Sequence, residues 1–313
     1  MFNYWTLEPY ELPSRGLYYP KDFEIRIRPL NVSEVKYLAT LNSENATKVC
    51  NEILLRCIEL KNITYNDIVL ADREYMAFWI RCNSFTQNSG YTITVPHCKG
   101  CKEEVQKEIR LESFKTVYVK SDVKEVYLPD IGATISLKQP RIADLHEYCS
   151  MPNPDETIRE YAMYLDSDNT IDEKYSFILK LTAYDFAILK DSIDQIHCGM
   201  HNELNIECPR CHALNPVKLI INDMSLFGAT KLTDILTTIT HIAKYAHLQI
   251  DNDWPWVEVE LEQKIVNDMI EQENKETNKA MSKANAQQAA AQAKANAAQH
   301  SMHSVPHYNV PHR

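Results

Sequence analysis

The chain repeats a series of landmarks at a spacing of about 110 residues, and this internal repeat constrains its fold more than any other feature. The first landmark is an LPxxG motif, which occurs at residues 12–16 and again at 128–132. Each motif is followed by a strand-like segment that ends in a proline, Pro29 or Pro140, and then by a helix-like stretch at 32–38 or 142–148. A duplication predicts this ordered recurrence, whereas chance similarity of two LPxxG strings does not.

Both halves then continue in the same order to a pair of cysteines. Apolar residues recur at helical spacing in the middle of each half, and Gly90 or Gly199 precedes a segment of alternating, strand-like pattern. Each of these segments leads into a CxxC motif with a second strand-like segment after it; the four cysteines are Cys98, Cys101, Cys208 and Cys211. We therefore expect an α+β fold with an internal duplication of a helix-plus-β unit, each copy carrying a zinc-knuckle motif.

The repeat also sets the predicted domain boundaries. The first repeat spans 1–120 and the second 121–228, and amphipathic patterns indicate a C-terminal helical segment at 229–275. Within that segment, Trp254-Pro255-Trp256 would suit a pocket on a partner, but it favours docking of the last helix onto its own core. From about Glu276 the composition changes to Ala, Gln, Asn and Lys, with too little apolar surface to offset the entropy of ordering. We predict a low-complexity, disordered tail at 276–313, whose Ala-rich part has the propensity to become helical under a partner.

The CxxC pairs carry the clearest chemical signal. A CxxC at a tight turn supplies two of the four ligands of a tetrahedral zinc ion, and Gly100 suits such a turn because the backbone there often takes a positive φ. The two knuckles could share one four-cysteine site, which the duplication slightly favours, or each could complete its own, or the thiols could be empty. The candidates for separate completion are Cys82, His97, His197, Cys198, His201 and His212.

A zinc site of this kind would be structural, because a catalytic zinc keeps an open position and needs a base nearby. The sequence contains no HExxH motif, and neither CxxC has a suitable HxE upstream as in the zinc deaminases. Its six glycines form no GxGxxG, Walker-type or GxSxG motif. We therefore predict a protein that is not an enzyme.

The balance of charged residues limits the classes of molecule that the protein is expected to bind. With 33 Lys and Arg against 43 Asp and Glu, the net charge of −10 argues against a general nucleic-acid binder. The alternative function is a cytosolic zinc-ribbon adaptor for nucleic acid or protein, for which Arg26, Arg28, Lys99 and Lys102 would form a basic patch. No apolar run approaches the roughly 18 residues of a membrane helix, and the N-terminal residues lack a secretory pattern. Nine cysteines with two CxxC pairs are typical of a reducing compartment.

An aromatic cluster near the N-terminus leaves two alternatives open. Its side chains could anchor a contact between subunits of an oligomer, where aromatic residues are enriched, or pack within their own domain. The cluster consists of Tyr4, Trp5, Tyr10, Tyr18 and Tyr19.

The order of these motifs resembles the baseplate hub and hub-assembly proteins of T-even-type contractile-tailed bacteriophages. The resemblance covers roughly residues 8–270, and the second knuckle is a less regular feature of that family. It is carried by LPSRGLYYP at 12–20, IRIRPLNVSEVKYL at 25–38, FWIRCNSF at 78–85, VPHCKGC at 95–101 and YLPDIGATISLKQPRIADL at 127–145.

This resemblance implies a structural or chaperone-like role in building the tail baseplate. The expected partners are other phage baseplate and tail proteins, with no membrane and no nucleic acid. The expected location is the host cytoplasm during assembly, followed either by retention in the virion tail baseplate or by release after assembly. The family supplies no catalytic residue to carry over to this chain.

Overall fold

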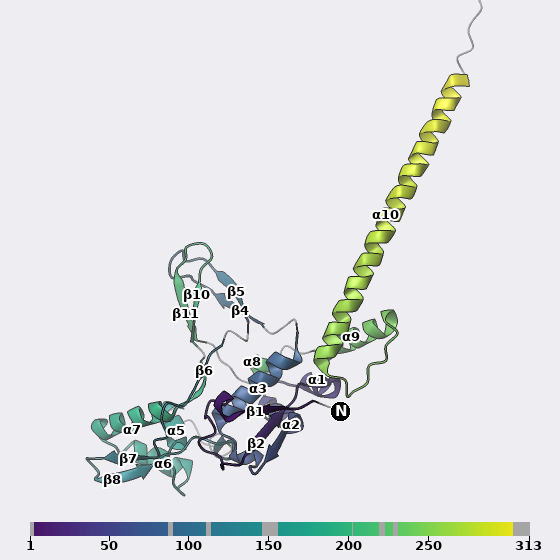
Figure 1. Cartoon of the computed structure of the whole chain (residues 1–313). Helices are drawn as coiled ribbons and strands as arrows, with labels where there is room; N and C mark the ends of the chain where they lie inside the picture. The colour runs from purple at the N-terminus through teal and green to yellow at the C-terminus, as the bar shows by residue number, and fades with distance from the viewer. Residues whose placement is uncertain are drawn as a thin grey trace, which may run out of the picture.

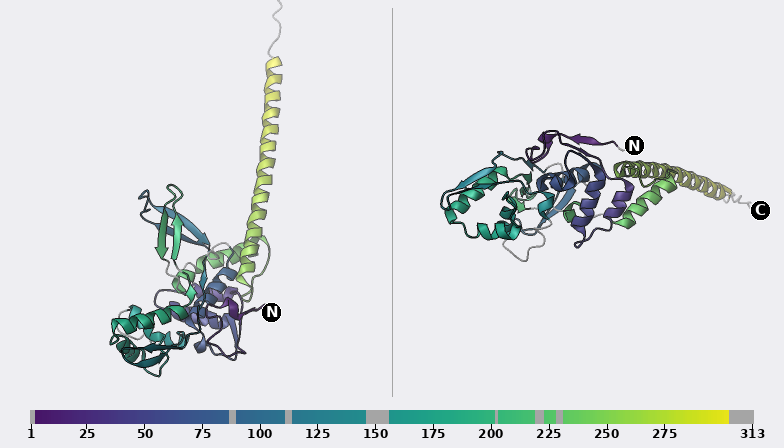
Figure 2. Two further views of the ribbon diagram at one scale, coloured as in Figure 1. Left: turned by 60° about the vertical axis from the view of Figure 1, so that its left-hand side comes forward. Right: turned by 90° about the horizontal axis from the view of Figure 1, so that it is seen from below.

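The computed structural model describes residues 3–86, 90–110, 114–145, 156–201, 203–218, 223–227 and 231–302 (Figure 1). A body of helices and short strands carries two features that stand away from it. One is a pair of β-hairpins and the other is a long C-terminal helix, and both project toward the same side (Figure 2). Helices and small antiparallel sheets together confirm the predicted α+β class.

The first half of the body is built on a three-stranded antiparallel sheet in the order β1-β2-β3. Its central strand buries Ile25 and Ile27 and turns Arg26 toward solvent, so a period of two fixes its inner face. The elements of this half are β1 (Trp5–Leu7), η1 (Pro9–Glu11), β2 (Glu24–Ile27), α1 (Val32–Leu38), α2 (Ala46–Cys57), β3 (Ile58–Lys61), η2 (Tyr65–Asp67) and α3 (Leu70–Ser84).

The second half begins with an antiparallel pair of strands and continues into helices. Thr170 and Thr182 cap two of these helices by accepting a backbone N–H bond with their side chains. Residues 142–145 are helical as predicted, and 146–148 lie outside the described residues. The elements are β7 (Glu125–Leu128), β8 (Ala133–Ser136), α5 (Glu156–Met163), α6 (Ile171–Ile178) and α7 (Ala183–Ile196).

Both LPxxG loops are held by a buried aspartate from the first turn of a later helix. Asp72 of α3 accepts hydrogen bonds from the backbone N–H and hydroxyl of Ser14, at 2.9 and 2.5 Å. Asp185 of α7 accepts from the backbone N–H groups of Asp130 and Ile131, at 3.2 and 3.1 Å. Both aspartates are fully buried. The same acid in the same helical turn therefore fixes the same loop in each half.

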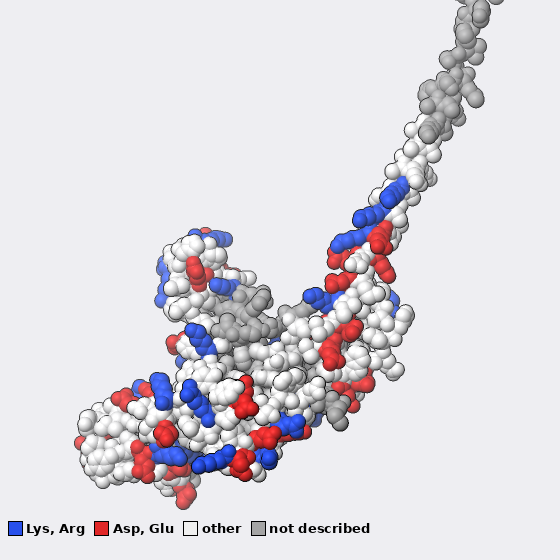
Figure 3. Space-filling view, in the orientation of Figure 1, with Lys and Arg blue, Asp and Glu red and all other residues white. Residues whose placement is uncertain are grey.

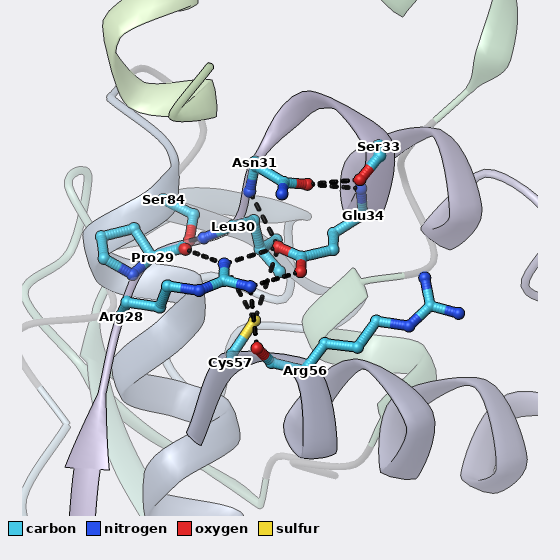
Figure 4. A network of polar contacts seen from close by, with 9 residues as sticks. All are labelled: Arg28, Pro29, Leu30, Asn31, Ser33, Glu34, Arg56, Cys57 and Ser84. Carbon is cyan, nitrogen blue, oxygen red and sulfur yellow. Dashed lines mark hydrogen bonds and ion pairs between the residues drawn. The ribbon is translucent and has the colours of Figure 1, made fainter. Parts of the chain in front are cut away.

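The segment after the first proline-ending strand contains a buried ion pair (Figure 4). The Arg28 guanidinium donates to both carboxylate oxygens of Glu34, at 2.9 and 2.7 Å, and to the carbonyl of Arg56. Glu34 also accepts the backbone N–H of Asn31, whose side chain caps α1 in return. Burial by itself lowers the pKa of Arg28, but the hydrogen bond and charge of Glu34 raise it on balance. The pair locks β2 to the start of α1.

A half-buried version of this arrangement recurs 110 residues later. Lys138 lies 2.7 Å from Asp144, and Asp144 accepts the backbone N–H of Arg141. The strands are anchored alike, because Arg28 donates its N–H to the carbonyl of Cys57 and Lys138 donates to that of Tyr164.

One continuous hydrophobic core contains residues from both halves and from the C-terminal helices. A smaller second core lies within the two hairpins. The linker between the halves adds a short strand, β6 (Thr116–Val117), which pairs with β9 (Gly199–Met200). The boundaries at 120/121 and 228/229 remain predictions, since the halves share their core.

The C-terminal helices are pinned to the first half. These elements are α8 (Asp223–Phe227), α9 (Leu232–Tyr245) and α10 (Trp256–Met302). Trp256 donates its backbone N–H to Leu30 and the carbonyl of Trp254 accepts from Val32, so the start of α10 lies beside the start of α1. Trp256 is buried, which is the docking predicted from its sequence.

The tail differs from the prediction of disorder from residue 276. The α10 backbone is helical to Met302, and 303–313 lie outside the described residues. The physical reason is propensity: the segment lacks apolar surface, but Ala, Gln and Lys are strong helix formers. No proline interrupts the helix between Trp256 and Met302.

The side chains of the N-terminal aromatic cluster differ in their burial. Tyr19 is buried and donates its hydroxyl to Asp72 at 2.6 Å, so it packs within its own body. Trp5 contacts Trp79 with ring centroids 5.8 Å apart and keeps half its surface exposed. Tyr10 is largely exposed at 70%.

Candidate metal centre

Two β-hairpins that lie side by side carry the CxxC motifs (Figure 1). In the first, β4 (Gly90–Val95) pairs with β5 (Val105–Arg110), and in the second, β10 (Glu203–Glu207) pairs with β11 (Leu214–Lys218). Each CxxC occupies the turn of its hairpin. The hairpins are therefore the local structure that alternating strands around a CxxC predict.

The backbone of the two turns is the same. The first cysteine of each pair donates its N–H to the carbonyl five residues on, Cys98 to Glu103 and Cys208 to Ala213, both at 3.0 Å. The residue after the second cysteine takes a positive φ, 66° at Lys102 and 58° at His212. The left-handed position is thus not Gly100, as the sequence suggested, because the turn places it two residues later.

Gly100 is needed for space instead. A Cβ at this position would lie 2.7 Å from Cys211 Sγ and 2.9 Å from Ala213 Cβ. Real Cβ atoms do not approach other heavy atoms this closely, and Ala213 is part of the opposing turn. The absence of a side chain at Gly100 lets the two knuckles approach each other.

The four cysteines form one cluster. Cys98 Sγ lies 3.5 Å from Cys211 Sγ, Cys101 Sγ lies 3.8 Å from Cys208 Sγ, and all four sulfurs lie within 4.8 Å of one another. Zn–S bonds of about 2.3 Å in a tetrahedron separate sulfurs by about 3.8 Å. The set therefore fits a tetrahedral, thiolate-binding ion such as zinc.

The cluster is closed on one side and open on the other. Cys98 and Cys208 are fully buried above Val95, Val105 and Ile206, whereas Cys211 is exposed. This leaves a path for an ion to enter.

Asn215 joins the knuckles beneath the sulfurs, and sequence reasoning missed it. Its buried amide accepts the backbone N–H of Lys99 at 2.8 Å and directs its Nδ2 at Cys98 Sγ, 3.6 Å away. Its position after the second CxxC is the only signal in the sequence. The equivalent position of the first knuckle, 110 residues earlier, is the apolar Val105, so the repeat does not point to an amide there. Arg210 and Glu103 form a further ion pair between the two turns.

The electrostatics of the cluster distinguish its thiols. Backbone N–H groups of Cys101 and Gly100 lower the pKa of Cys98 to about 6, against the opposing effect of burial. Burial and the neighbouring thiols raise the pKa of Cys101 to about 12. A dication would displace the remaining protons, so binding is expected to release protons.

The other proposed ligands are not brought to the cluster. His212 Nδ1 contacts Glu207 at 2.7 Å, and His197 Nδ1 contacts the Tyr164 hydroxyl at 2.9 Å. Cys82 belongs to α3 in the body, and Cys198 is buried there. Within the described ranges, the four CxxC cysteines are the one group of His, Cys, Asp or Glu ligand atoms close enough to hold an ion.

The basic patch expected for a nucleic-acid adaptor does not form. Arg28 is buried in its pair with Glu34, and Arg26 pairs with Glu59 at 2.6 Å in the body sheet. Lys99 and Lys102 belong to the first knuckle, which stands away from that sheet (Figure 1).

Residues 8–228 match the family model described as T4 bacteriophage base plate protein. The chain belongs to this family. The resemblance inferred from the motif order is thereby confirmed. The T4 base plate match contains both LPxxG loops and both knuckles, and it ends before α9 and α10.

No curated protein and no solved structure gave a significant match to this T4 base plate family member. In the part of the chain that the structure describes, no helix has the length and hydrophobicity required of a membrane span.

Proposed function

We propose that this chain is a non-enzymatic structural or chaperone-like component of a contractile phage tail baseplate, where it binds other baseplate proteins at the hub. The observation that carries this proposal is the family match over 8–228, which includes most of both halves of the body and both knuckles. A structural role also agrees with a sequence that offers no catalytic residue set.

Mass spectrometry of purified phage particles and of tail-assembly intermediates tests the proposal. A structural component is expected in mature particles at a fixed stoichiometry, and a chaperone-like one only in the intermediates. Normal tails from phage that lack this gene product would overturn both forms of the proposal.

We further infer that Cys98, Cys101, Cys208 and Cys211 bind one structural zinc ion. The inference is supported by their sulfur separations, by the buried amide of Asn215 and by the backbone donors aimed at Cys98. The ion would hold the two hairpins together and leave no open position for a substrate.

Metal analysis of protein purified without chelator tests this inference, with about one zinc per chain expected. The Cys98→Ser, Cys101→Ser double variant is expected to lose the metal, to unfold at a lower denaturant concentration and to fail to assemble with its baseplate partners. Cys82→Ser, outside the cluster, is the matched control. Less than about 0.2 zinc per chain in the wild type would contradict the inference.

We also infer that the two halves are copies of one ancestral unit. Support comes from contacts that recur in both, namely the aspartates under the LPxxG loops, the acid that follows each proline and the matching knuckle turns. Superposition of residues 8–118 on 124–228 in an experimental structure tests this, and unrelated topologies would refute it.

A further inference from the structure

The outer part of α10 is a solitary helix. The element has 47 residues, which corresponds to a length of about 70 Å. Every residue from 271 to 293 is exposed, and no other element that the structure describes lies beside this part of the helix (Figures 1 and 2). Isolated helices are marginal in water, because most helical stability in proteins comes from packing. A helix of this length is therefore the kind of element that another helix covers.

Charge is segregated along this helix. Residues 256–276 contain seven acidic residues and two lysines, a net charge of −5. Residues 277–302 contain three lysines and no acidic residue, a net charge of +3. The outermost lysines stand farther from the body than the acidic side chains (Figure 3). The helix thus has an acidic inner half and a basic outer half.

The two halves also differ in side-chain size. Leu261, Ile265 and Met269 recur at a spacing of four and remain about half exposed, while Val259 and Val266 face the body. The outer half contains ten alanines in 277–302. Large exposed side chains on one half thus correspond to small residues on the other, which allow close approach of a second helix.

We propose that α10 pairs in an antiparallel arrangement with α10 of a second copy of this chain. A two-fold axis near Thr277 places the acidic half of each helix beside the basic half of the other. Glu271 then lies beside Lys283 of the partner subunit, and Ile265 beside Ala289 of the partner subunit. A parallel pair would oppose acidic to acidic and basic to basic, which costs energy along its length. This surface lies outside the residues matched by the family and goes beyond the proposed function.

Sedimentation of the full chain across a concentration series tests the pairing. Wild-type protein is expected to dimerise, and the dimer to weaken as salt rises because its charges are exposed. The Lys283→Glu variant and the Glu271→Lys variant are each expected to dimerise at least about tenfold more weakly, since each reversal acts on both sides of the axis. The chain that carries both changes is expected to recover the dimer.

The single charge reversals separate an antiparallel dimer from a parallel one. In a parallel dimer the Lys283→Glu change would replace one like-charge contact with another and leave affinity unaltered. Lys21→Glu, on an exposed lysine of the body, is the matched control for net charge. Circular dichroism verifies that helicity is retained, as Glu and Lys have similar helix propensity. A wild type that stays monomeric, or a dimer insensitive to the reversals, would overturn the proposal in favour of a different baseplate protein on this helix.

Discussion

Single residues decide how closely the two knuckles approach. Gly100 has a negative or extended backbone that other residues could adopt, so its importance comes from the atoms opposite it. Its missing side chain makes room for Cys211 Sγ, a proposed ligand. By contrast, Gly132 in the second LPxxG loop has a φ of 66° and open space around its Cα. The two glycines are required for different physical reasons.

Gly100→Ala is expected to lower zinc affinity by about tenfold or more, because the added methyl group displaces a proposed ligand sulfur. Loss of a residue that positions a metal ligand has an effect of similar size. Gly132→Ala is expected to leave the affinity unchanged and to cost about 1 kcal/mol of folding stability through its backbone alone. Competition with a chromophoric chelator measures the first effect, and urea denaturation the second. Equal zinc affinity in both variants would contradict the role assigned to Gly100.

The ion pairs that flank Pro29 and Pro140 occupy equivalent positions in the two halves but differ in burial. Arg28→Ala is expected to destabilise the fold by about 3 kcal/mol, because it leaves the buried Glu34 carboxylate unpaired. Lys138→Ala removes a partly exposed pair and is expected to cost about 1 kcal/mol or less. Urea denaturation of both variants provides the comparison. If Lys138→Ala lowered the free energy of unfolding as much as Arg28→Ala, burial would not explain the difference between the two pairs.

At the level of elements, sequence periodicity predicted the hairpins and most helices, because alternation and helical spacing are local properties. The joint four-cysteine cluster was predictable only through the repeat, since 107 residues separate Cys101 from Cys208. Asn215 and the left-handed Lys102 were not predictable, because each depends on the opposing turn or on hydrogen bonds that leave no pattern in the sequence. The extent of α10 was missed because low apolar content was weighed above helix propensity.

Removal of metal is expected to loosen the hairpins and leave the body intact. Among the described residues, the hairpins are joined by a small core of Val95, Val105 and Ile206 together with two of the cysteines, by Asn215 and by the Arg210–Glu103 ion pair. This is a much smaller set of contacts than the main core of the body. Chelation is therefore expected to speed amide hydrogen exchange at least about tenfold in β4, β5, β10 and β11. Exchange in α3 and α7, which belong to the main core, is expected to stay the same. Uniform exchange across both regions would show that the knuckles and body unfold together.

At the level of the whole molecule, one body carries two separate projections, the pair of hairpins and α10. The main core joins both halves, so the body is expected to unfold as one unit. The knuckle pair and α10 extend from it without adding to that core beyond their attachment points. The α+β class of the body was accessible from the sequence pattern, whereas the relative placement of these projections is a tertiary property.

Deletion of residues 271–313 is expected to leave the melting temperature of the body within about 2 °C of wild type, because residues 271–293 are exposed. The far-ultraviolet helical signal is expected to fall by the contribution of the deleted helix. Thermal unfolding followed by circular dichroism measures both quantities. A large fall in melting temperature at low protein concentration, where no dimer forms, would contradict the independence of this segment.

The division of the four cysteines between the two hairpins has a consequence during synthesis. The second pair leaves the ribosome 107 residues after the first. At ordinary elongation rates of about 5–20 residues per second, Cys98 and Cys101 wait roughly 5 to 20 seconds for their partners. During that interval the two thiols of the first knuckle lack the two cysteines that complete the cluster. The cluster can therefore form only after translation has passed Cys211. A chain that is interrupted before this point would contain a first knuckle without its partner.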